Sequence, residues 1–229
     1  MTNSQVSTTF AAALFAGVMA LSVLPAPAGA ASGATVEEAM SYDGLQKTSI
    51  QGVDLAYVRP GASLAGYTQV LLDPVGVAFH KDWNPNRTGS RMKLTDSDRE
   101  NIRARISKLV NDEFVRTLAA RGGYPTVSAP GPNVLRVKAD VINVYITAPG
   151  VMTAGRTRTY TATAGQMTLV AQLFDSQTGE VLARIIDHRG ATNTGRMTQS
   201  TSVSNAAEGR IIASRWAGLL RSALDKAQT

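Results

Sequence analysis

The two histidines, His80 and His188, are the side chains in this sequence best suited to acid–base chemistry. Each lies near an acidic residue, Asp82 or Asp187, so each imidazole could be a base that a carboxylate orients. A hydrolase also needs a nucleophile, and no serine lies in a Gly-x-Ser-x-Gly pattern. The same residues could bind a metal ion if the strand ends met, but no His-x-x-x-His or other close ligand spacing occurs. We therefore expect no catalytic residue, metal site or cofactor.

A second candidate is a small cationic and aromatic group, Arg156, Arg158 and Tyr160, in and after the glycine-containing loop 149–158. Guanidinium groups beside a tyrosine could bind an anionic ligand or a lipid headgroup, although arginines on an outer strand face are more often simply solvated. The loop lacks the spacing of a phosphate-binding glycine motif. Trp83, in a polar loop, could anchor a partner or a membrane interface, or could fold back onto the domain.

Composition excludes several classes of protein. The chain has 229 residues, 44% of them hydrophobic and 17% charged, which is too apolar for a disordered chain. Cysteine is absent, which excludes a disulfide framework, a thiol nucleophile and a cysteine-linked lipid anchor. The net charge of +6 could draw the protein to an anionic envelope component, but basic residues are scattered and aromatic ones few, so we expect no nucleic-acid partner.

The first thirty residues resemble a cleavable signal peptide. An apolar run, 10–24, is followed by small residues that include Ala28 and Ala30, at the positions signal peptidase recognises. As a helix the run would span about 22 Å, which is shorter than the hydrocarbon core, so a membrane anchor is the less favoured alternative. The start of the chain, 1–9, carries no lysine or arginine, which is atypical of a signal. We expect an exported, periplasmic product with no transmembrane segment after cleavage.

The rest of the chain predicts a partly ordered leader over 31–50 and one domain over 51–229. Extended segments are expected over 53–58, 67–79, 135–146, 159–174 and 181–187. The second should break at Asp73-Pro74 and the fourth should bend near Gly165. A turn containing Gly179 should precede the last. One helix is expected from Thr95, capped with Asp98, to Gly122-Gly123, and another from Asn205, with Glu208 as its capping-box partner.

These elements predict an α+β fold, because each helix carries one apolar stripe that needs a sheet to cover. The stripe of the first helix contains Ile102, Ile106, Leu109, Val110, Phe114 and Leu118. We expect a mainly antiparallel sheet of about five strands, backed on one face by the two long helices.

The sequence also resembles a family of exported bacterial proteins, many of them lipoproteins, known as the domain of unknown function 3313. The similarity covers about residues 41–226. It rests on segments that include Ser41-Tyr-Asp-Gly-Leu45, Ala56-Tyr-Val-Arg-Pro-Gly61, Val70-Leu-Leu-Asp-Pro-Val75, Lys81-Asp-Trp83, Gly122-Gly-Tyr-Pro125, Ala154-Gly-Arg-Thr-Arg-Thr-Tyr160 and Gly165-Gln-Met-Thr-Leu169. The resemblance implies an envelope protein and provides no catalytic residues. Since this chain lacks the lipobox cysteine of many members, an outer-membrane lipid anchor is not expected.

Three hypotheses for function follow. The leading one is a non-enzymatic envelope protein that acts through contacts with a protein or another envelope component. The alternative is a domain that binds a small ligand or an anion through Arg156, Arg158 and Tyr160. The least favoured is a hydrolase that uses His80 or His188.

Overall fold

The computed structural model describes residues 43–84, 94–146, 159–161, 165–190, 198–200 and 202–229, without the side chains of 159–161, 198–200 and 202. These residues all belong to one unit, 35–229. The predicted signal peptide with Ala28 and Ala30, and most of the predicted leader, lie outside the described residues. Strand β1 (Gln46–Thr48) falls inside the range expected to be leader.

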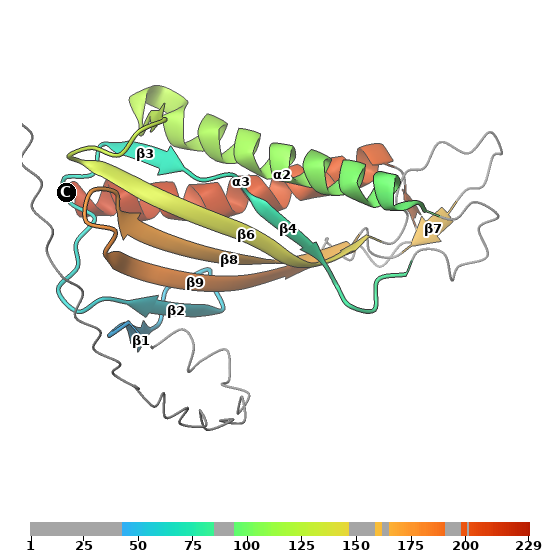
Figure 1. Cartoon of the computed structure of the whole chain (residues 1–229), viewed down its shortest axis with the longest axis horizontal. Coiled ribbons are helices and arrows are strands. Elements are labelled where there is room, and N and C mark those ends of the chain that lie inside the picture. Colours follow the sequence, from blue (N-terminus) through green and yellow to red (C-terminus); the bar gives the residue numbers. More distant parts are fainter. Residues whose placement is uncertain (1–42, 85–93, 147–158, 162–164, 191–197, 201) are drawn as a thin grey trace, which may run out of the picture. The chain divides into compact units, whose positions relative to one another are not determined.

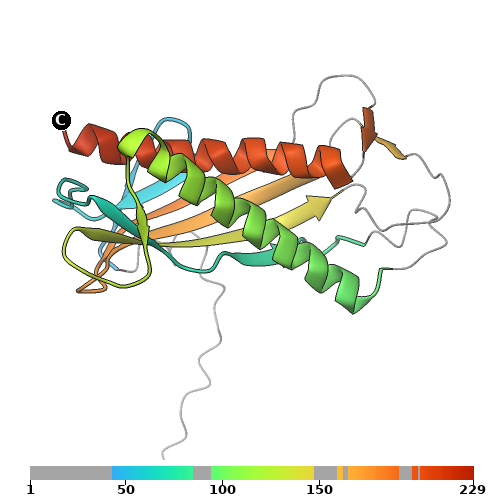
Figure 2. The same cartoon turned by 90° about the horizontal axis from the view of Figure 1, so that it is seen from above.

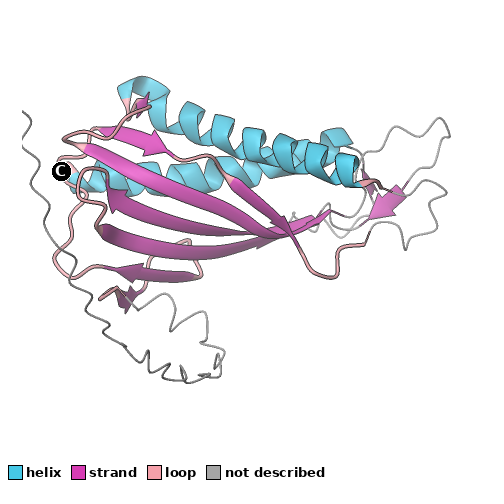
Figure 3. Cartoon of the chain, in the orientation of Figure 1, coloured by secondary structure: helices cyan, strands magenta, loops and turns pink. Residues whose placement is uncertain are grey.

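An eight-stranded mixed sheet forms the body of this unit (Figures 1 and 3). Its strand order is β1-β2-β9-β8-β6-β3-β5, and β4 also pairs with β6, beyond the end of β3. The other strands are β2 (Leu55–Val58), β3 (Gln69–Leu72), β4 (Gly76–Phe79), β5 (Thr126–Val127), β6 (Val134–Ile146), β8 (Gly165–Asp175) and β9 (Val181–Gly190). A separate antiparallel pair joins β7 (Thr159–Thr161) to β10 (Thr198–Ser200).

The prediction of about five mainly antiparallel strands is therefore corrected. The α+β class is confirmed, but the sheet has eight strands and is mixed, because β3 and β4 run parallel to β6, and β3 runs parallel to β5. The reason lies in the helix α2 (Asp96–Ala119), which carries the chain from the end of β4 back along the sheet. Strands that follow such a crossover run in the same direction as those that precede it.

The two helices begin in different ways. Before α2, the Thr95 side chain accepts a hydrogen bond from the Asp98 backbone N–H, and Asp98 in turn accepts one from the backbone of Thr95, so the predicted cap is confirmed. Helix α3 (Ser202–Ala227) begins three residues before Asn205, which is therefore an internal helical residue. Of several residues in that polar stretch able to cap a helix, the prediction chose one too far along the chain.

Both helices cover the same face of the sheet (Figure 2). The core beneath them contains side chains with no measurable exposure from the sheet and from both helices, among them Val70, Val110, Leu118, Leu135, Val137, Val141 and Leu224. No helix in the described part of the chain combines the length and apolar character needed to cross a bilayer.

A β-bulge in β6 changes which residues face this core. The register against β8 pairs Ile142 with Thr168 and Tyr145 with Gln166, so β6 contains one extra residue there. Asn143 absorbs it with a φ of 53°. The inward positions are odd-numbered up to Val141 and even-numbered from Val144 onward. This shift explains why the sequence is apolar on both alternating sets after Val141.

The structure confirms two further sequence predictions and corrects a third. The break between β3 and β4 falls at 73–75, as expected from Asp73-Pro74. The β8–β9 hairpin is confirmed, and its turn places Gly179 at φ 72°, where a glycine is favoured. The expected long strand 159–174 is two strands in two sheets, β7 and β8.

Candidate functional site

The candidate site is an apolar cleft between the N-terminal halves of α2 and α3. Figure 2 shows the two helices close together at their C-terminal ends and separated at their N-terminal ends, with the end of β6 between them. The cleft encloses about 150 Å³. Its apolar lining comes from α2 (Ile102, Ile106, Leu109), from α3 (Ala206, Gly209, Ile212) and from the sheet (Val144, Ile146, Met167).

Hydrogen bonds join the two helices at their C-terminal ends. Nη1 of Arg221, on α3, donates hydrogen bonds to the carbonyl oxygens of Thr117 (3.1 Å) and Leu118 (3.2 Å), which lie in the last turn of α2. These carbonyls have no acceptor role inside the helix; the guanidinium is a donor to both, and the Leu118 carbonyl also accepts from the Tyr124 backbone N–H at 2.8 Å. Nearer the cleft, Ser107 Oγ donates to the Val75 carbonyl oxygen at 2.7 Å and holds α2 on the sheet.

Glycine at position 209 contributes no side chain to the space between the helices. A Cβ placed there would lie 3.6 Å from one methyl group of Leu109 and 4.0 Å from Cε of Met167, both of which line the cleft. These are ordinary van der Waals distances, so an alanine would fit and a longer side chain would occupy the space. Gly218, two to three turns further along α3, has nothing within 4 Å of the same position.

Polar groups lie at the rim of the cleft. Arg105, Gln166, Asn205 and Glu208 line it beside the apolar residues. Nε of Arg105 donates to the Asn101 carbonyl oxygen at 3.2 Å, one turn back on the same helix. The arrangement suits an apolar group inside the cleft with a polar end outside it, and offers no nucleophile paired with a base.

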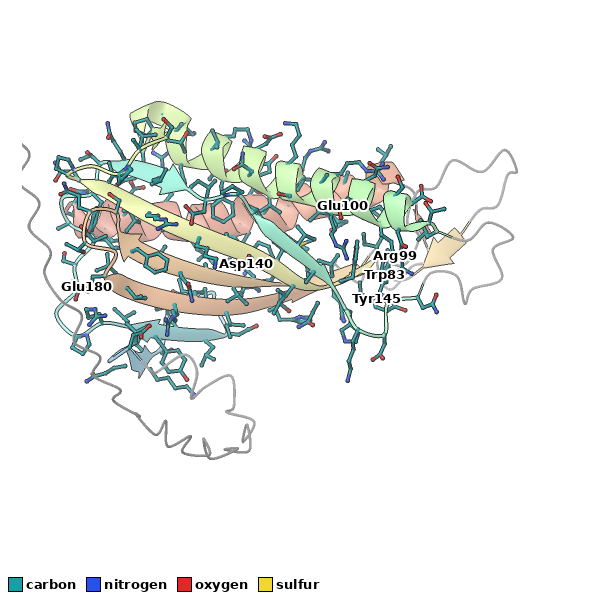
Figure 4. All side chains as sticks on the ribbon, viewed as in Figure 1. Trp83, Arg99, Glu100, Asp140, Tyr145 and Glu180 are labelled. Carbon is teal, nitrogen blue, oxygen red and sulfur yellow. The ribbon has the colours of Figure 1, made fainter. Side chains whose placement is uncertain are left out.

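Trp83 packs in a hydrophobic cluster that adjoins the cleft. Its side chain is 4% exposed, so in this structure it folds back onto the domain and is not a surface anchor. The ring stacks on Phe79 with 4.1 Å between centroids, and Nε1 donates to the Ile146 carbonyl oxygen at 2.9 Å. Ile102, a residue that lines the cleft, packs in the same cluster. The guanidinium of Arg99 lies 5.5 Å from the ring centroid (Figure 4).

Of the other predicted site residues, the cationic and aromatic group falls outside the described side chains, and the two histidines lie apart. Arg156 and Arg158 lie outside the described residues, and Tyr160 is placed in β7 without a described side chain. The histidines belong to strands separated by β6 and β8: His80 follows β4, and His188 lies in β9. Nδ1 of His188 lies 3.1 Å from Thr168 Oγ1, and Nδ1 of His80 lies 3.8 Å from an Asp82 oxygen. Within the described ranges, no three His, Cys, Asp or Glu side chains gather as a metal site would require.

A buried polar cluster beneath α3 was missed by the sequence analysis. The Asp187 side chain has no exposure and accepts hydrogen bonds from Trp216 Nε1 (2.7 Å) and from Arg189 Nε (2.5 Å) and Nη2 (2.9 Å). Arg189 also donates to the Gly52 carbonyl oxygen. Strand alternation could have revealed it, because Ala183, Ile185, Asp187 and Arg189 share one face of β9. Its hydrogen bonds are internal, which indicates a structural role.

The chain belongs to the family described as "Protein of unknown function (DUF3313)", whose family model matches residues 31–219. The resemblance seen in the sequence is thereby confirmed. Among curated proteins, none matches the chain.

Several solved structures are distantly similar to the chain. Protein XCC0632 from Xanthomonas campestris is 16% identical, with a TM-score of 0.43, over 75% of this chain and 94% of that one. The PelC dodecamer from Paraburkholderia phytofirmans is 13% identical, with a TM-score of 0.36, over 77% and 96%. The hypothetical protein CT253 from Chlamydia trachomatis is 13% identical, with a TM-score of 0.31, over 67% and 98%.

Proposed function

We propose that this protein is exported to the bacterial cell envelope and acts there by binding an envelope component, without catalysing a reaction. The observation that supports this proposal is the apolar cleft between α2 and α3, which receives an apolar group of that component. A cavity of about 150 Å³ lined by aliphatic side chains holds a group of about six carbon atoms, the size of benzene. The end of an alkyl chain, with its polar head at the rim near Arg105, has the matching chemistry.

Straight-chain alcohols of four to eight carbons test the cleft. A ligand that binds only the folded state raises the midpoint of thermal unfolding. We expect hexanol to raise the midpoint of the wild-type protein and of Gly218→Leu, and to leave that of Gly209→Leu unchanged, because only the leucine at 209 fills the cleft. An equal rise in all three proteins would contradict the proposal.

Methyl NMR gives a measurement that does not depend on the Gly209→Leu variant. In wild-type protein labelled at its methionine methyl groups, hexanol should shift the Met167 signal, since Met167 lines the cleft. Assignment follows from a Met167→Leu variant. An unchanged Met167 signal at a concentration of hexanol that raises the unfolding midpoint would place binding elsewhere and overturn the assignment of the cleft.

Export is tested on the N-terminus of the protein recovered from cells. Cleavage after Ala30 leaves Ala31 as the first residue, which mass spectrometry of the periplasmic fraction would detect. Protein that retains Met1 in the cytosol would contradict the envelope location, whatever the outcome at the cleft.

A further inference from the structure

The outer side of α3 carries large apolar side chains exposed to solvent. Val203 is 76% exposed and Ile211 is 60% exposed, the two highest values among the large hydrophobic residues of the described ranges. They lie eight residues apart with exposed Ala207 between them, so at 3.6 residues per turn all three share an arc of about 80°. We call Val203, Ala207 and Ile211 the α3 ridge. Burial of the rest of the helix does not require the ridge to be apolar.

Arginines flank the α3 ridge on both sides. Arg210 and Arg215 are exposed, and at 100° per residue they lie about 20° outside one border of the ridge and about 40° outside the other. Neither forms an ion pair with a described side chain. The acidic residues of α3 lie outside the ridge: Glu208 is about 60° beyond its Ile211 border and lines the cleft, and Asp225, about four turns further along the helix, accepts a hydrogen bond from Tyr124 at 3.0 Å. The surface around the ridge is therefore apolar in the middle and cationic at its edges.

We propose that the α3 ridge contacts the surface of an anionic phospholipid membrane. A helix that lies on such a surface places its apolar side chains at the boundary of the acyl region and its basic side chains among the lipid phosphates. Guanidinium groups suit this position because they bind phosphate oxygens in pairs and are weakly hydrated. This contact is separate from the cleft, which opens on the other side of α3.

The charge distribution argues against a second copy of the chain as the occupant. A two-fold contact through the ridge would bring Arg210 and Arg215 of one copy toward those of the other, whereas Glu208, the acidic residue of α3 between Val203 and Arg215, lines the cleft instead. Two large side chains also provide far less area than the roughly 1,200 Å² of a stable interface. A phosphate-rich lipid surface satisfies the arginines and needs no such area.

A single fluorescent label tests the proposal, since the sequence has no cysteine. A polarity-sensitive probe on Ile211→Cys should brighten and shift to the blue with vesicles of 70% phosphatidylcholine and 30% phosphatidylglycerol. The same probe on Lys138→Cys, an exposed position of β6 on the face of the sheet opposite the helices, should not respond. No response at 211, or an equal response at 138, would overturn the proposal.

Vesicle co-sedimentation of unlabelled variants separates the two kinds of contact. We expect Val203→Ser/Ile211→Ser to weaken binding about tenfold, and Arg210→Gln/Arg215→Gln to weaken it about fivefold for each charge at low salt. Lys81→Gln/Lys138→Gln removes the same net charge from other exposed positions and should change binding less than twofold. Equal weakening by both charge variants would show that net charge alone attracts the protein, and would overturn the assignment to the ridge.

The outcome is independent of the proposed function. Gly209→Leu fills the cleft without touching the α3 ridge, so it should lose the response to hexanol and keep full vesicle binding. A loss of vesicle binding in Gly209→Leu with native circular dichroism would show that lipid enters through the cleft, and would overturn the ridge as the contact.

Discussion

At the scale of single residues, the Asp187 carboxylate is the most deeply buried charge among the described side chains. It has no contact with water, and its three hydrogen bonds come from Trp216 and Arg189. Removing one partner of a buried ion pair leaves the other charge without compensation. We expect Asp187→Asn to lower the free energy of unfolding by roughly 3 kcal/mol, measured by urea denaturation.

Two further variants give comparison values for the loss in free energy of unfolding. Trp216→Phe removes one hydrogen bond and part of a ring, and should cost about 2 kcal/mol. Asp82→Asn changes an acidic side chain that is 71% exposed, and should cost less than about 0.5 kcal/mol. If Asp187→Asn cost no more than Asp82→Asn, the buried cluster would contribute nothing to stability.

The pair formed by Tyr67 and Asp175 gives a pH dependence. The hydroxyl of Tyr67 donates to the Asp175 carboxylate at 2.9 Å. Burial, followed by this hydrogen bond, raises the pKa of Tyr67 from 10.0 to about 12. The backbone N–H of Thr178, followed by the Tyr67 hydroxyl, lowers the pKa of Asp175 below 3.8. The hydrogen bond therefore requires a protonated tyrosine and an ionised aspartate.

The signs of the two shifts define the range in which the pair stabilises the fold. Because the pKa of Asp175 is lowered, its contribution is full above about pH 4 and is lost as the pH falls through the lowered value. Because the pKa of Tyr67 is raised, its contribution is full below about pH 10 and is lost as the pH rises through about 12. We expect Tyr67→Phe to cost about 1 kcal/mol at pH 7 and less at both extremes, measured by urea unfolding.

Tyr145→Phe is the matched control for this experiment. Tyr145 is 40% exposed, and its hydroxyl has no hydrogen-bond partner among the described residues. Its loss should cost little at pH 7. A cost of Tyr67→Phe that stayed constant from pH 3 to pH 12 would show that the pair does not couple stability to protonation.

At the scale of elements, the sequence predicted most helices and strands because their patterns are local. The cap of α2, the break at Asp73-Pro74 and the turn at Gly179 each depend on a few neighbouring residues. The bulge at Asn143 could not be predicted, because an extra residue in β6 is defined only against its partners β4 and β8. The cleft was missed for a similar reason: its lining comes from two helices and two strands whose relative positions no single segment encodes.

Gly76, in β4, leaves room for the Asp140 side chain of β6. A Cβ on Gly76 would overlap the Asp140 side chain of the neighbouring strand (Figure 4). Because the overlapping oxygen is the end of a half-exposed side chain that can turn away, Gly76→Ala should lower the free energy of unfolding by no more than about 1 kcal/mol. Asp140→Ala removes the overlapping carboxylate and should restore most of the loss in the double variant.

The double-mutant cycle distinguishes overlap from the other effects of an alanine. If Gly76→Ala cost the same in the presence and absence of the Asp140 carboxylate, the coupling would be zero and the contact would not explain the glycine. Gly218→Ala is the control for a glycine without neighbours. It should stabilise the protein by about 0.5–1 kcal/mol, because alanine favours the helix.

At the scale of the whole molecule, the sheet has long central strands and a short strand at each edge. Strands β6 and β8 pair on both sides over long registers, whereas β1 is three exposed residues at one border and β5 is two residues at the other. Local opening requires breaking fewer contacts at the borders. We expect backbone amides of β6 and β8 to exchange hydrogen at least about a hundredfold more slowly than those of β1, measured by NMR.

The mixed character of the sheet belongs to this scale as well. Alternation predicted which residues face the core, but the direction of β3 and β4 relative to β6 depends on the path of α2, which no periodicity records. In the hydrogen-exchange experiment, equal protection of the backbone amides of β1 and β8 would show that the sheet opens only as a whole.

Two contacts hold the C-terminal half of α3: Arg221 donates to the last turn of α2, and Trp216 Nε1 donates to the buried Asp187 carboxylate. From Trp216 to Asn205 the helix extends about 17 Å, so a tilt of about 7° at Trp216 would displace the N-terminal end by about 2 Å. A displacement of that size is comparable to the radius of a methylene group, whereas the side chains that follow Trp216 would hardly move. Under the proposed function, the width of the cleft would then adjust to alkyl groups of different thickness while the C-terminal half of α3 stays packed.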